Sequence, residues 1–112
     1  CSRCSTNKLS GPLPAEFADL ASIEILWLDH NQLTGTLPGA WALWKAVTDI
    51  SVNSNQLGGT VPLVWGNLGA SLTDLWLKGN PRLQGCLPRG LEQFKGNADT
   101  CQGTGLRCEI CS

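Results

Sequence analysis

A pattern of eight residues, Asn-x-Leu-x-Gly-x-(Leu/Val)-Pro, recurs in this chain at a constant interval of 24 residues. Copies start at Asn7, Asn31 and Asn55, and a fourth copy with small insertions starts at Asn80. A constant period of this length indicates that one structural unit repeats, and that each unit buries its apolar face by stacking on its neighbours. We therefore expect the chain to build an extended surface from stacked coils.

The residues within one repeat indicate how a single coil is built. Only the stretch from Leu26 to Leu28 alternates, which predicts a brief strand with one buried face. Asn31 follows where the chain must turn, and an inward-facing amide there can bond the backbone of its own and adjacent coils. The segment from Gly35 to Pro38 then ends the turn, because glycine relaxes the backbone and proline fixes φ. Structural asparagines are thus predicted at Asn7, Asn31, Asn55 and Asn80.

Large apolar residues recur in two further series after each repeat proline. The first series comprises Phe17, Trp41, Trp65 and Leu91. The second comprises Leu20, Trp44, Leu68 and Phe94. Because these positions keep the repeat spacing, we expect them to stack inside the core, the first series on its convex side, rather than to form a platform for a ligand.

Composition limits the class of protein. The 112 residues suit one domain, and a net charge of −1 provides no basic surface for nucleic acid. No apolar run reaches the roughly 18 residues that a membrane-spanning helix needs. Methionine is absent, which indicates a processed or excised piece of a longer chain.

Cysteines stand only near the two ends of the chain, at Cys1, Cys4, Cys86, Cys101, Cys108 and Cys111. This layout predicts disulfide-braced ends in an oxidising compartment, although reduced thiols are the alternative. The last four cysteines allow three pairings, and a bridge from Cys86 into the tail would seal the open strand edge of the last coil. The two Cys-x-x-Cys pairs at the ends could also hold zinc, but the repeats between them disfavour this. No metal and no cofactor are expected.

The repeat resembles the plant-type form of the leucine-rich repeat family, L-x-x-L-x-L-x-x-N-x-L-x-G-x-(I/L/V)-P. Residues 26–38 and 50–62 fit it fully, and residues 75–88 fit it with one inserted residue. The resemblance implies a leucine-rich repeat solenoid, a right-handed stack of about four 24-residue coils with a short parallel sheet on the concave face. It divides the chain into repeats over residues 1–95 (1–14 incomplete, then about 15–38, 39–62 and 63–88) and a Cys-rich C-terminal cap over residues 89–112.

The junctions Leu-Pro-x-x-Trp, which ends at Trp41, and Val-Pro-x-x-Trp, which ends at Trp65, together with the short Cys-rich tail, are similar to kinetoplastid surface antigens of the promastigote surface antigen and proteophosphoglycan types. That resemblance implies an extracellular, cell-surface protein with a lipid-anchored precursor. Its partner would be a protein or glycan, such as a host receptor. The alternatives are an ectodomain fragment of a plant or algal receptor, a wall-protein inhibitor, or a structural or decoy antigen without a ligand.

In that fold the residues that alternate with the inward leucines face the concave surface and are the candidate partner-binding residues. They are Ile25, Trp27, Asp29, Asp49, Ser51, Asn53, Asp74, Trp76 and Lys78. An exposed tryptophan suggests a binding partner, because aromatic anchors dominate interfaces. The alternatives are that Trp27 and Trp76 pack over neighbouring side chains and that the aspartates form an ordinary solvated face.

An enzyme is the rival class, on the basis of His30, Asp29 and Ser54. Asp29 and His30 are neighbours on an expected strand, so their side chains should point to opposite sides. Because no motif of a nucleophile or a phosphate site accompanies them, we predict no catalytic residue.

Overall fold

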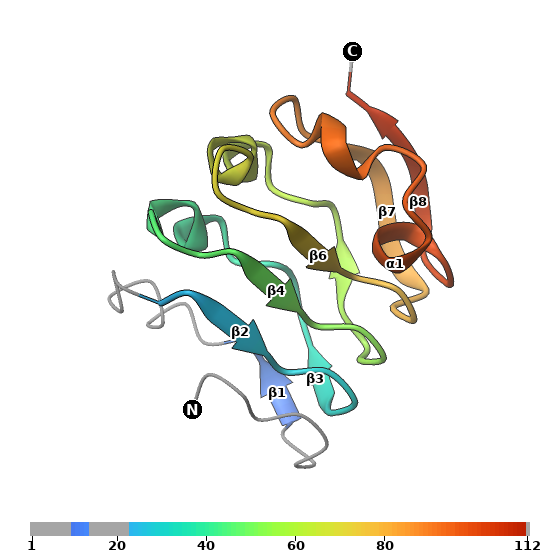
Figure 1. Ribbon diagram of the computed structural model, residues 1–112. Coiled ribbons are helices and arrows are strands. Elements are labelled where there is room, and N and C mark those ends of the chain that lie inside the picture. Colours follow the sequence, from blue (N-terminus) through green and yellow to red (C-terminus); the bar gives the residue numbers. More distant parts are fainter. Residues whose placement is uncertain (1–9, 14–22, 112) are drawn as a thin grey trace.

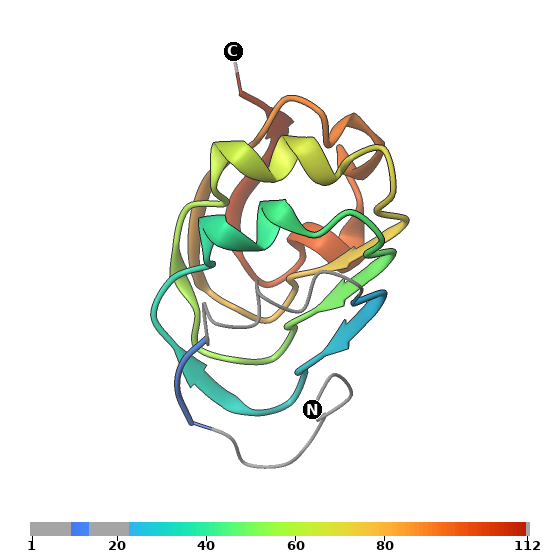
Figure 2. The same cartoon turned by 90° about the vertical axis from the view of Figure 1, so that its left-hand side faces the viewer.

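Residues 10–13 and 23–111 are described by the computed structural model, and they form a stack of coils with the C-terminal segment alongside the last coil (Figure 1). Each coil runs along a short strand, turns, passes a second extended segment and returns through a helical turn (Figure 2). Predictions that concern Cys1, Cys4, Asn7, Phe17 and Leu20 lie outside the described residues.

The first strands of successive coils form a three-stranded parallel sheet. It consists of β2 (Ile25–Trp27), β4 (Asp49–Ser51) and β6 (Asp74–Trp76), in that order. The register joins Ile25 to Asp49 and Asp74, Leu26 to Ile50 and Leu75, and Trp27 to Ser51 and Trp76. The middle row is buried and the rows beside it face the other side of the sheet, as the period of two residues predicted.

The second extended segments line up on the opposite side of the coils. β1 (Ser10–Pro12) pairs with β3 (Gln32–Thr34), and β5 (Gly58–Gly59) pairs with β7 (Arg82–Leu87), which pairs in turn with β8 (Gly105–Ile110). A bridge between Thr36 and Gly58 connects the two sets, and Gly58 N donates to Gly35 O at 2.8 Å. The repeat glycines Gly35, Gly59 and Gly85 all have positive φ, of 82°, 76° and 93°. Glycine recurs in the pattern because this turn needs a backbone conformation that other residues rarely adopt.

Short 3-10 helices close the coils behind each repeat proline. They are η2 (Gly39–Leu43), η3 (Leu63–Leu68) and η4 (Glu92–Phe94). Trp41 and Trp65 lie on η2 and η3, are fully buried, and stack with ring centroids 6.0 Å apart. The indole nitrogen of Trp65 donates to the Pro38 carbonyl oxygen at 2.8 Å, so its polar atom is satisfied inside the core. These tryptophans are core residues that join one coil to the next.

Leucines and valines fill the space between the sheet and the helical turns. Leu28, Val52 and Leu77 occupy the same position in successive coils and are at most 2% exposed. Burial of one such side chain contributes roughly 1.5–3 kcal/mol. The common interior row that the repeat spacing predicts is therefore present.

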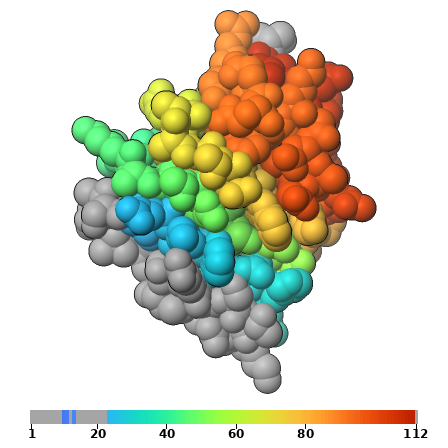
Figure 3. All heavy atoms as spheres, in the orientation of Figure 1, coloured from blue at the N-terminus to red at the C-terminus, as the bar shows by residue number. Residues whose placement is uncertain are grey.

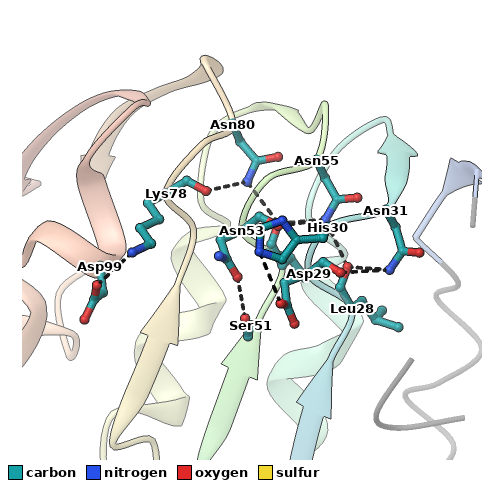
Figure 4. A network of polar contacts seen from close by, with 11 residues as sticks. Leu28, Asp29, His30, Asn31, Ser51, Asn53, Asn55, Lys78, Asn80 and Asp99 are labelled. Carbon is teal, nitrogen blue, oxygen red and sulfur yellow. Dashed lines mark hydrogen bonds and ion pairs between the residues drawn. The ribbon is translucent and has the colours of Figure 1, made fainter. Parts of the chain in front are cut away.

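Asparagine side chains satisfy the backbone where each coil turns. Asn55 Nδ2 donates to the carbonyl oxygens of Val52 in its own coil and Leu28 in the preceding coil, at 2.9 and 3.0 Å, and its Oδ1 accepts from Leu33 N. Asn80 repeats this arrangement one coil later, with donation to Val52 O at 3.0 Å. Figure 4 shows these amides as a row that crosses the coils.

The C-terminal segment covers both open edges of the last coil. α1 (Ala98–Cys101) begins at Asn97, whose side chain accepts from the Asp99 and Thr100 amides. The Asp99 carbonyl oxygen accepts from Leu77 N at 3.1 Å, and the Thr100 hydroxyl donates to Leu75 O at 2.7 Å. α1 therefore caps the edge of β6, while β8 caps the edge of β7. This covering removes unpaired strand edges that would otherwise invite association.

Disulfides hold this cap in place. Cys86 of β7 is bonded to Cys111, and Cys101 is bonded to Cys108. The bridge from Cys86 runs into the tail, in the direction expected. The tail also contains a strand, since β8 starts at Gly105. The tail becomes a strand because the exposed edge of β7 offers hydrogen bonds that no local sequence pattern reveals.

Candidate binding site on the three-stranded sheet

A hollow of about 500 Å³ lies on the outward face of the three-stranded sheet. It is lined by Trp27, Asp29, Asp49, Ile50, Ser51, Asp74 and Trp76. We refer to these seven residues as the sheet hollow. Its volume falls in the range typical of ligand pockets, about 300–1,000 Å³. Figure 3 shows the coils as successive bands of colour across the molecule, with the C-terminal segment beside the last band.

Two half-exposed tryptophans form the walls of the sheet hollow. Trp27 is 39% exposed and Trp76 is 38% exposed, and Ser51 lies between them in the register. With strands about 4.8 Å apart, the two tryptophans stand roughly 10 Å from each other along the sheet. Ser51 is only 6% exposed, so it forms a small floor between two large rings.

The face of Trp76 is already in contact with a positive charge. Lys78 Nζ lies 5.5 Å from the centre of the Trp76 ring and 3.3 Å from Asp99 Oδ1. The second distance joins the sheet to α1, as Figure 4 shows. The repeat pattern predicts Lys78 on this face. It does not predict the contact with Asp99, because Asp99 lies in the cap, outside the repeats, where no periodic pattern indicates its position.

Carboxylates occupy one end of the sheet hollow. Asp49 and Asp74 are neighbours in the register of β4 and β6, so their backbones lie about 4.8 Å apart. The Thr73 hydroxyl lies 3.4 Å from Asp74 Oδ2. Among the described residues, no basic side chain forms an ion pair with either aspartate.

Two residues expected on the exposed row are buried instead. Ser51 and Asn53 are 6% and 5% exposed, and the Ser51 hydroxyl donates to Asn53 Oδ1 at 2.6 Å. Ser51 is the last residue of β4, and Asn53 follows two residues later. Ile25, which also belongs to the predicted row, lies on the outer strand β2 of the sheet and is partly buried.

The expectation that Asp29 and His30 point to opposite sides was wrong. His30 Nε2 lies 3.8 Å from Asp29 Oδ2, and His30 has a positive φ of 56°. β2 ends at Trp27, so both residues are in the turn, where strand alternation no longer applies. Ser54 has the same backbone conformation one coil later, with φ of 58°. No hydrogen bond links Ser54 to His30 within the described part of the chain, so the serine, histidine and aspartate are not assembled for nucleophilic catalysis.

Other chemistry has little support in the described residues. In residues 10–13 and 23–111 no three metal-binding side chains come together. Cys108 and Cys111, which the zinc alternative required, are each held in a disulfide. The Gly90 amide, which donates to the Glu92 carboxylate, lowers the pKa of Glu92. Glu92 belongs to the cap and not to the sheet hollow.

The repeat geometry and a family match agree. The family described as Leucine Rich Repeat matches residues 22–44, which include β2, the turn at Asn31 and β3. The chain has a leucine-rich repeat fold. No curated protein matches the sequence. In the part of the chain that the structure describes, no helix is long and apolar enough to cross a membrane.

Several solved structures of plant proteins contain the same fold. The BIR2 ectodomain from Arabidopsis thaliana is 25% identical with a TM-score of 0.73, over 94% of this chain and 53% of that one. The Arabidopsis receptor kinase HAESA, in complex with the peptide hormone IDA and the co-receptor SERK1, is 29% identical with a TM-score of 0.70, over 79% and 15%. A plant ice-binding protein is 30% identical with a TM-score of 0.70, over 77% and 27%. This leucine-rich repeat chain thus spans roughly half or less of the proteins it matches.

Proposed function

We propose that this chain is an extracellular leucine-rich repeat module that binds a peptide or protein segment in the sheet hollow, with Trp27 and Trp76 as anchors. The observation that carries the proposal is the pair of half-exposed indoles on either side of a small, buried serine. Large aromatic side chains at the walls of a concave surface are the residues that most often dominate binding energy.

The comparisons support a peptide or protein as the partner. HAESA was solved with a peptide hormone and a co-receptor, and BIR2 was solved as an ectodomain. The disulfides Cys86–Cys111 and Cys101–Cys108 agree with an oxidising, extracellular location. The similarity to plant receptor ectodomains favours a receptor-like ectodomain over the surface-antigen alternative. Attachment to a membrane through a longer precursor stays a prediction.

A fold alone does not determine a partner, because the leucine-rich repeat fold also serves an ice-binding protein. The proposal therefore depends on the sheet hollow and its residues. It predicts that substitution of the two anchors removes binding without loss of the fold, since both rings are on the surface and outside the core.

The test selects ligands from a random-peptide display library against the immobilised chain. We expect the double variant Trp27→Ala/Trp76→Ala to bind the selected peptides at least about 30-fold more weakly, which is typical when anchor residues are truncated. Leu63→Ala is the matched control, because Leu63 is 71% exposed on η3 and away from the sheet hollow.

Thermal unfolding of the same variants separates binding from stability. An unchanged midpoint together with lost binding supports the proposal. Retained binding by the double variant would contradict it, and so would a collapse of the midpoint. Binding of oligosaccharides on a glycan array, if it depended on the same tryptophans, would replace the peptide with a glycan as the partner.

A further inference from the structure

We propose that the sheet hollow selects a cationic peptide, and that it holds one arginine or lysine side chain between Trp27 and Trp76 against Asp49 and Asp74. This inference rests on the proposed function and specifies its ligand class. It combines three independent features of the hollow: its aromatic walls, its carboxylates and its polar floor.

The dimensions of the sheet limit the length of the recognised segment. β2, β4 and β6 span two strand spacings, roughly 10 Å, across the sheet. An extended peptide that crosses them advances about 3.3 Å per residue. The walls therefore accommodate about three residues, with the central side chain above Ser51.

The walls favour a cation. An indole face attracts a positive charge within about 6 Å of its centre, and arginine also stacks on such rings. The protein itself shows this preference, because Lys78 Nζ lies 5.5 Å from the centre of the Trp76 ring. Lys78 is also paired with Asp99, so it is held toward α1. A ligand cation can then approach from the Ser51 side of the ring.

Charge on the facing elements points the same way. β4 and β6 each begin with an aspartate, and neither forms an ion pair among the described residues. Adjacent like charges in a partly enclosed hollow repel each other, so an incoming positive charge is favoured and a negative one disfavoured. Asp29, which lies near His30, adds a third carboxylate to the hollow. The positive charge of Lys78 is balanced by the carboxylate of Asp99. A neutral sugar would leave the charge of Asp49 and Asp74 uncompensated.

A polar side chain beside the floor of the hollow suits a peptide backbone: Asn53 does not line the hollow but is hydrogen-bonded to Ser51, which does. Asn53 is 5% exposed, and its Oδ1 accepts from the Ser51 hydroxyl. Its Nδ2 donates no hydrogen bond within the described residues. Every buried side-chain nitrogen or oxygen atom in those residues has a partner, so Nδ2 retains access to solvent. In Figure 4 this nitrogen points away from Ser51. A carbonyl oxygen of the bound segment would supply the acceptor that Nδ2 lacks.

The test titrates four blocked tripeptides, acetyl-Ala-X-Ala-amide with X as Arg, Lys, Gln or Glu, into the full chain. The measurement is the NMR shift of the indole N–H groups of Trp27 and Trp76, up to a concentration of ~10 mM because contacts this small bind weakly. We expect the Arg and Lys peptides to bind at least about ten-fold more tightly than the Gln and Glu peptides. Their binding should weaken as salt is added, since salt screens exposed charges.

Variants assign the preference to its residues. Asp49→Asn/Asp74→Asn should reduce the advantage of Arg over Gln to about two-fold or less, because the variant keeps the side-chain shape and removes the charge. Glu109→Gln is the control for one lost negative charge, since Glu109 is exposed on β8, on the opposite side of the coils.

Three outcomes would overturn the inference: equal affinity for all four peptides, tighter binding of the Glu peptide, or no shift with any of them. If all four peptides bound with equal affinity and this binding were lost in Trp27→Ala/Trp76→Ala, the proposed function would stand. Only the preference for a cationic peptide would then be contradicted. Display-selected peptides whose binding is unaffected by that double variant would instead contradict the proposed function itself.

Discussion

At the scale of single residues, Asn55 carries an unusual share of the hydrogen bonding. Its amide bonds carbonyl oxygens in two coils and accepts an amide from a third segment. Main-chain groups in the interior must be paired, and this one side chain bonds three of them. The repeat keeps asparagine here because this amide has both a donor and an acceptor within reach of the neighbouring coil.

Replacement of Asn55 with alanine should therefore be costly. We expect Asn55→Ala to lower the free energy of unfolding by about 1–3 kcal/mol, because Leu33 N loses its acceptor while Leu28 O and Val52 O each lose one of two amide donors. Chemical denaturation measures the change. Asn97→Ala is the comparison, since Asn97 caps a single exposed helix end and should cost only about 1 kcal/mol. A smaller loss for Asn55→Ala than for Asn97→Ala would contradict this role.

The sequence predicts the exposure and contacts of some side chains and not of others. The exposure of Trp27 and Trp76 follows from alternation along a strand, and the burial of Trp41 and Trp65 follows from their place after the repeat proline. The contact between Asp29 and His30 does not follow from alternation along a strand, because it depends on the positive φ of His30 in a turn. Local periodicity applies only as far as the strand continues.

At the scale of elements, η3 and the start of the cap touch backbone to backbone. A Cβ atom built on Gly66 would collide with the carbonyl oxygen of Arg89, and one on Gly69 would collide with the carbonyl oxygen of Gly90. Gly90 itself has φ of 106° and lies against Gly66. Three glycines thus allow the last coil to lie closely on the one before it.

Gly66→Ala should separate these elements. We expect a loss of about 3 kcal/mol or more in the free energy of unfolding, because the new methyl group meets backbone that has no room to move. Gly39→Ala is the matched control at the start of η2. Its Cβ would lie 3.5 Å from Val64, an ordinary contact, so thermal unfolding should show little change. Equal midpoints for the two variants would contradict the close approach.

At the scale of the whole molecule, the cap determines whether the stack ends cleanly. β8 pairs with β7 and α1 covers β6, and the disulfide from Cys86 to Cys111 ties the end of the tail to the last coil. Stacked repeats need such a terminal unit, because the last coil would otherwise expose its strand edges and apolar face.

The two disulfides should contribute unequally. Cys86–Cys111 closes a span of 25 residues and Cys101–Cys108 closes one of 7. From the entropy of the unfolded chain we expect Cys86→Ala/Cys111→Ala to cost about 3–4 kcal/mol and Cys101→Ala/Cys108→Ala to cost about 2 kcal/mol. Denaturant titration gives both values, and size-exclusion chromatography should show association only where the edge of β7 is freed. The reverse order of stabilities would contradict this assignment.

The repeat period by itself determined the coil, its inward leucines and its asparagine turn. This was possible because the same 24-residue unit recurs, so local pattern and tertiary contact have the same period. Only the tertiary structure decided the disulfide pairing, the conversion of the tail into β8, the burial of Ser51 and Asn53, and the contact of Lys78 with Asp99. Those features join the repeats to a segment outside the period or depend on contacts between residues of the folded chain, and the pattern of a single repeat predicts neither.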